Sequence, residues 1–74
     1  MRVDLNITIN HGHGAEDGER VVTGVEVPLE PHLADVLILE DPRLADLAGL
    51  RVVRRRVWSA GLELMCEAFP RSPT

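Results

Sequence analysis

Two histidines separated by one residue are the first side chains in this sequence with the chemistry to bind a metal. His11 and His13 flank a glycine, and on a strand this spacing places both imidazoles on one face, where they can chelate a divalent cation. A metal site needs three or four fixed ligands, and His32 and Cys66 are the residues that could join the pair. Because the stretch is rich in glycine, we expect a solvated loop and no cofactor, and keep a metal-binding module as an alternative.

Four arginines and the single tryptophan form a second set, which could bind nucleic acid. They are Arg51, Arg54, Arg55, Arg56 and Trp58. On a strand, Arg54, Arg56 and Trp58 share a face, so guanidinium groups beside an indole could bind phosphates and stack on a base. The alternative is a solvated face on which arginines cover apolar surface and pair with Glu63 and Glu67. Since the net charge is −4 and nucleic-acid-binding domains are usually basic, direct nucleic-acid binding is the runner-up function.

Acidic side chains are concentrated in the first part of the chain. Residues 1–46 hold ten Asp or Glu and three Arg, whereas residues 47–74 hold two and five. Acidic groups gathered on one face could occupy a basic groove on a partner, although a net charge of this size also serves solubility alone. The predicted protein-interaction residues are Glu16, Asp17, Glu19, Glu26 and Glu30.

Nucleophiles and bases are present, but none stands in a recognisable catalytic motif. Ser59, Cys66 and the three histidines lie outside any nucleophile elbow, phosphate-binding loop or pair of carboxylates. Cys66 alternates with Leu62 and Leu64, which indicates a buried, inert thiol. A chain of 74 residues also has little room for a ligand pocket on the order of several hundred Å³. We therefore expect a protein that is not an enzyme.

Alternation of apolar and polar residues predicts two hairpins that would position these side chains. Residues 1–10 and 21–30 predict two strands joined by a loop over 11–20. Residues 51–58 and 62–69 predict a second hairpin. Its turn is either a two-residue Ala60-Gly61 loop or a three-residue loop that shifts the register.

The segment between the hairpins predicts a short helix. Asp41 suits the N-cap, Pro42 the first helical position and Gly49 the C-terminal stop, which together indicate about two turns. Residues 35–39 remain open between helix and strand, because so short an apolar run fits both.

These elements predict an α+β domain over residues 1–69, followed by a flexible C-terminal tail over residues 70–74. The expected core is a small, mostly antiparallel sheet of four or five strands, built from two hairpins, with one or two short helices. A β-grasp-like arrangement is one candidate. The longest apolar run, residues 36–39, is far below the roughly 20 residues of a membrane span. The chain also opens without a signal-peptide pattern, so we expect a cytoplasmic protein without a membrane partner.

Small size, the lack of a catalytic set and the separation of charge predict a small acidic protein-interaction module. We expect it to act by stoichiometric binding to a larger protein or protein–nucleic-acid complex. Inhibitors of nucleic-acid-handling machinery, carried by phages or mobile elements, are one such class. A homodimer is also open, because unpaired sheet edges pair with other chains and a dimer enlarges a small core. Pro28 works against such pairing on one edge.

Overall fold

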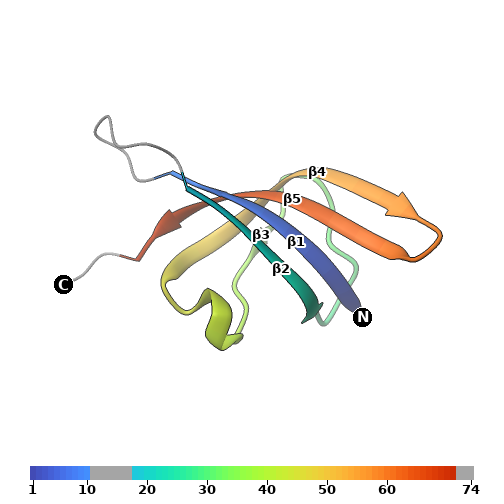
Figure 1. The fold of residues 1–74 in the computed structure, drawn as a ribbon, viewed down its shortest axis with the longest axis horizontal. Helices are drawn as coiled ribbons and strands as arrows, with labels where there is room; N and C mark the ends of the chain where they lie inside the picture. The colour runs from blue at the N-terminus through green and yellow to red at the C-terminus, as the bar shows by residue number, and fades with distance from the viewer. Residues whose placement is uncertain (11–17, 72–74) are drawn as a thin grey trace.

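A five-stranded mixed sheet forms nearly the whole fold (Figure 1) in the computed structural model, which describes residues 1–10 and 18–71. Its elements are β1 (Arg2–Ile9), β2 (Gly18–Glu26), β3 (Val36–Leu37), η1 (Pro42–Leu44), β4 (Leu47–Trp58) and β5 (Gly61–Pro70). The strand order is β2-β1-β5-β4-β3. The central pair, β1 and β5, is parallel, and the other three pairs are antiparallel.

The expected α+β class is wrong, because strands hold 64% of the described residues and helical turns only 5%. Asp41 and Pro42 do begin a turn, and the Asp41 carboxylate accepts a hydrogen bond of 2.9 Å from the Arg43 amide. The turn is 3-10 helix and ends at Leu44, and the chain is extended again from Leu47. A bulge in β4 lets Leu47 and Leu50 both reach the core from a strand. Leu44 and Leu47, the leucines of the predicted helix, are therefore both buried without a two-turn helix, and the β-grasp-like arrangement, which needs a helix, is also wrong.

The predicted alternation of buried and exposed side chains over residues 1–10 is confirmed. The buried ones form one side of the hydrophobic core. Alternate residues of β1 are buried, as are their parallel neighbours on β5. This places Leu5 beside Leu64 and Ile7 beside Cys66, each at most 1% exposed. We call the side of the sheet that carries these residues the inner face.

The β4–β5 hairpin turns one residue earlier than expected. Its two-residue turn is Ser59-Ala60, so Trp58 pairs with Gly61 and Arg56 with Glu63. Neither the Ala60-Gly61 loop nor the three-residue loop is present. Gly61 adopts φ +151° directly after the turn, a value that suits glycine.

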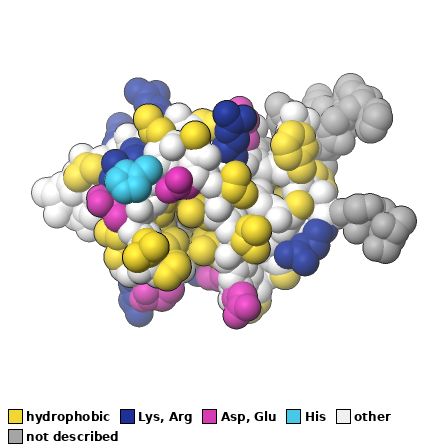
Figure 2. All heavy atoms as spheres, turned by 180° about the vertical axis from the view of Figure 1, so that it is seen from behind, with side chains coloured by type: hydrophobic (Ala, Val, Ile, Leu, Met, Phe, Trp, Pro, Cys, Tyr) yellow, Lys and Arg dark blue, Asp and Glu magenta, His cyan; other side chains and the backbone are white. Residues whose placement is uncertain are grey.

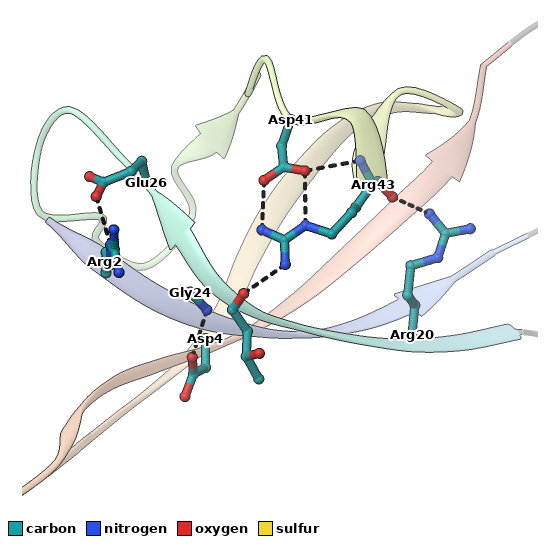
Figure 3. Close-up of polar contacts among 8 residues, drawn as sticks. Arg2, Asp4, Arg20, Gly24, Glu26, Asp41 and Arg43 are labelled. Carbon is teal, nitrogen blue, oxygen red and sulfur yellow. Dashed lines mark hydrogen bonds and ion pairs between the residues drawn. The ribbon is translucent and has the colours of Figure 1, made fainter.

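The inner face is covered by the curl of the sheet and by the chain that connects β3 to β4. Leu44 of η1 is buried in the core, and Leu37 and Leu39 pack against it. Arg20 of β2 binds Asp46. Arg20 also donates to the Arg43 carbonyl (Figure 3), and Arg43 of η1 donates a 2.8 Å hydrogen bond to the Thr23 carbonyl. These contacts join the first strand in the sheet order to the segment that precedes β4.

The sheet extends past residue 69, where the expected domain ends. Pro70 pairs with Leu47, and the Arg71 amide donates a 2.8 Å hydrogen bond to the Asp46 carbonyl. Residues 72–74 lie outside the described residues. Within residues 1–10 and 18–71, no helix is long and apolar enough to cross a membrane.

Candidate binding surface

The side of β4 and β5 that faces away from the core carries four of the five residues of the predicted nucleic-acid site. We call it the outer face of the β4–β5 hairpin. Alternation along the two strands and the bulge between Val52 and Arg54 define its members. They are Arg51, Val53, Arg54, Arg56 and Trp58 of β4, and Glu63, Met65, Glu67 and Phe69 of β5.

Arg56, Trp58 and Glu63 form the distal end of this face. The guanidinium of Arg56 lies 3.6 Å from the Glu63 carboxylate, and the arginine side chain remains 68% exposed. The three residues line a shallow hollow of about 360 Å³. Trp58, at 52% exposure, presents its indole beside this charged pair.

Arg51, Glu67 and Phe69 form the other end of the outer face. The register places Arg51 opposite Glu67. Together with Val36 of β3 they border a hollow of about 390 Å³. Phe69 is 59% exposed and Val36 63% exposed, so this hollow has apolar walls that water reaches. Seen from the side opposite to Figure 1, other exposed hydrophobic side chains stand among basic and acidic groups (Figure 2).

Among the described residues, two of the arginines form neither an ion pair with a carboxylate nor a hydrogen bond to a backbone carbonyl. Five arginines bind carboxylates: Arg2, Arg20, Arg43, Arg55 and Arg56. Arg71 donates to the Leu47 carbonyl. In the part of the chain that the structure describes, Arg51 and Arg54 form neither kind of contact, and both lie on the outer face. The two arginines that lack both kinds of contact among the described residues therefore lie on the same face of the hairpin.

Arg55 belongs to the opposite side of the sheet. It pairs with Leu64, whose side chain is in the core, and its own side chain is only 25% exposed. Its Nη2 donates a 2.8 Å hydrogen bond to Glu30 Oε1. Among the described residues, its buried Nε has no hydrogen-bond partner. The four arginines of the predicted nucleic-acid site are thus divided three to one between the faces.

The acidic residues predicted to bind a partner are not brought together where they are described. Glu26 binds Arg2 at 3.0 Å, which with the N-terminal amino group lowers the pKa of its carboxyl. Glu30 is held by Arg55. Glu19 lies opposite Thr8, at the far end of β2 from Glu26. Glu16 and Asp17 lie outside the described residues.

The remaining candidate groups do not form a catalytic or metal-binding constellation within residues 1–10 and 18–71. No three His, Cys, Asp or Glu side chains meet there with metal-ligand geometry, while His11 and His13 lie outside these ranges. Cys66 is 1% exposed, and burial raises the pKa of its thiol to about 11. The His32 amide donates to Asp35 Oδ2 at 2.8 Å, within a local turn.

Three apolar members of the outer face were not among the predicted site residues: Val53, Met65 and Phe69. Alternation with the buried Leu64 and Ala68 would have assigned Met65 and Phe69 to the exposed face. Val53 is there because of the bulge, for which the sequence gives no signal.

No protein-family model, curated protein or solved structure matches this chain. We therefore infer function from the surface itself. The outer face combines guanidinium groups, exposed aromatic rings, a thioether and two carboxylates on a rigid hairpin. Such an arrangement can bind a surface of complementary charge and shape.

Proposed function

We propose that this protein is a small, acidic, non-enzymatic module of the cytoplasm that binds a larger protein stoichiometrically through the outer face of the β4–β5 hairpin. The observation that carries the proposal is that Arg51 and Arg54, without ion pairs in the described chain, lie on the same face as the exposed rings of Trp58 and Phe69. Arginine, aromatic residues and methionine are enriched at protein interfaces. Tryptophan and arginine are also the commonest residues of high binding energy there.

The carboxylates on the same face favour a protein partner over nucleic acid. Glu63 lies 3.6 Å from Arg56, and Glu67 is opposite Arg51. A phosphate backbone would meet these carboxylates as well as the arginines, and the whole chain carries a charge of −4. A protein surface can match charges of both signs at close range.

Nucleic acid is the second candidate because Arg54, Arg56 and Trp58 do share one face. A partner that is itself a protein–nucleic-acid complex is compatible with both candidate functions. Inhibition of nucleic-acid-handling machinery, as by proteins of phages or mobile elements, is one role for such a module. Binding through an acidic surface has less support, because Glu26 and Glu30 already bind arginines.

Differential capture from a lysate of the source organism tests the proposed function. Three tagged baits are compared: the wild type, the double variant Arg54→Glu/Trp58→Ala, and the control Arg2→Glu, which reverses an exposed charge on β1, outside the β4–β5 hairpin. We expect one protein to be retained in equimolar amount by the wild type and the control, and to be lost with the double variant. Equal retention by all three baits, or no retained protein at low salt, would contradict the proposal.

A further inference from the structure

Among the described residues, no strand neighbours one side of β4 over its last six residues. β3 pairs only with Leu50 and Arg51 of β4. The backbone of Val52 then bonds Ala34 and Asp35 at 2.8 and 2.9 Å. Within residues 1–10 and 18–71, no strand pairing continues from there along residues 53–58 on this side. These six residues are therefore an open sheet edge.

The register identifies the backbone groups that this edge presents. Trp58 and Gly61 flank the two-residue turn, and such flanking residues form a hydrogen-bonded pair. Opposed residues in an antiparallel pair alternate between bonded and non-bonded positions. Arg55 and Val57 consequently direct their amide and carbonyl groups away from β5, toward the open edge.

A second copy of this chain, paired in the register centred on Arg55, does not suit the edge. An antiparallel pairing of two β4 edges centred on Arg55 would place Arg55 opposite Arg55 and Arg54 opposite Arg56 of the second copy. Like charges directly opposed across strands are destabilising. A strand with carboxylates at alternate positions would instead place each one beside an arginine.

We propose that an extended acidic segment of the partner protein adds to this edge as a sixth strand. The inference rests on the proposed function, whose partner it specifies. The backbone of the segment pairs with the outward groups of Arg55 and Val57, as in other cases of strand addition. Its carboxylates lie on the outer face beside Arg54 and Arg56. Its apolar side chains reach the inner side, where Val57 is 74% exposed and Arg55 is already held by Glu30.

A synthetic peptide tests this inference on the full-length protein. The probe is acetyl-Thr-Glu-Val-Glu-Val-Glu-Thr-amide, with a control in which lysines replace the glutamates. Two further control peptides are N-methylated on alternate amides. In one of them the methylated amides are those that would face β4, and in the other they are those that would face away from it. Hydrogen exchange by NMR is measured at Arg55 and Val57. We expect the acidic peptide to slow exchange of both amides roughly tenfold, while the lysine peptide and one N-methylated form have no effect and the other N-methylated form still binds.

Several results would overturn strand addition. One is that millimolar acidic peptide does not slow exchange of the Arg55 and Val57 amides, and another is that both N-methylated forms bind equally. A third is that exchange of these amides slows as the protein concentration rises without peptide, which would indicate pairing with a second copy. Arg54→Glu should weaken peptide binding roughly tenfold, whereas Arg2→Glu should leave it unchanged. If peptide binding fails while Arg54→Glu/Trp58→Ala still loses the captured protein, the edge inference falls and the proposed function stands. If capture is also unaffected, the proposed function itself fails.

Discussion

Arg20 and Asp46 meet through two parallel hydrogen bonds, each 2.8 Å long, between β2 and the residue that precedes β4. The same guanidinium donates to the Arg43 carbonyl at 3.0 Å (Figure 3). This bidentate geometry is the strong form of an arginine–carboxylate pair. The pair connects β2 to the segment before β4, two elements that share no strand pairing.

Acid should weaken the fold through this contact and through the Asp41–Arg43 pair. Hydrogen bonds from Arg20 and Arg43 lower the pKa of Asp46 and of Asp41 from 3.8 to about 2. Because the folded-state pKa values are depressed, the stabilisation is complete above pH 3.8 and is lost as the pH falls toward 2. Urea unfolding at a series of pH values should show this decline, and Asp46→Asn or Arg20→Gln should flatten it. Identical slopes for the wild type and both variants would contradict the assignment.

The sequence predicts local features of this fold better than distant ones. The β1 alternation and the Asp41–Pro42 turn depend on neighbouring residues, and both are present. The parallel pairing of β1 with β5 joins residues such as Leu5 and Leu64, which nothing in the local pattern associates. The two-turn helix was wrong because the Asp41–Pro42 signal begins only a 3-10 turn, and Leu44 and Leu47 are buried equally well by that turn and the strand that follows it.

The same distinction holds for the candidate surface. Placing Arg54, Arg56 and Trp58 on one face required only the period of a strand. Predicting that Arg55 forms an ion pair with Glu30 would have required knowing that the chain near residue 30 passes the inner side of β4. The described members of the acidic set, Glu19, Glu26 and Glu30, do not gather for a related reason, because their charges were counted along the sequence while the fold engages two of them with arginines.

Gly24 occupies a position that other residues tolerate poorly. Its φ is +66°, and its amide donates a 3.1 Å hydrogen bond to Asp4 Oδ1 at the irregularity between β1 and β2. A Cβ there would meet no atom within 4 Å, so the cost of a side chain comes from the backbone alone. Gly24→Ala should lower the free energy of unfolding by roughly 1 kcal/mol.

Gly49→Ala is the matched control for Gly24→Ala. A Cβ at Gly49 would make an ordinary contact of 3.4 Å with Val36 Cγ1, and its φ is not in the left-handed region. We expect a change within about 0.5 kcal/mol, measured by urea unfolding as for Gly24→Ala. Equal losses in the two variants would show that backbone conformation at Gly24 is not the cause.

Cys66 should react with thiol reagents only when the protein unfolds. The side chain is 1% exposed in the core, and burial raises the pKa of the thiol from 9.0 to about 11. At pH 8, labelling with a chromogenic disulfide should follow the population of unfolded protein and accelerate with urea. The raised pKa also implies stability that is complete below pH 9 and declines as the pH rises toward 11. Rapid labelling under native conditions would place the thiol at an accessible position instead.

Trp58 provides a direct test of the nucleic-acid alternative, because it is the only tryptophan and is 52% exposed. Stacking of a base on its indole would change its fluorescence. The outer face carries three arginines against two glutamates, so few phosphates could be neutralised and little counterion release would drive binding. At about 0.15 M salt, we expect single-stranded and duplex oligonucleotides to leave the fluorescence unchanged. Saturable quenching that weakens with salt, and that is lost in Arg54→Glu but kept in Arg2→Glu, would instead favour nucleic acid as the ligand of this face.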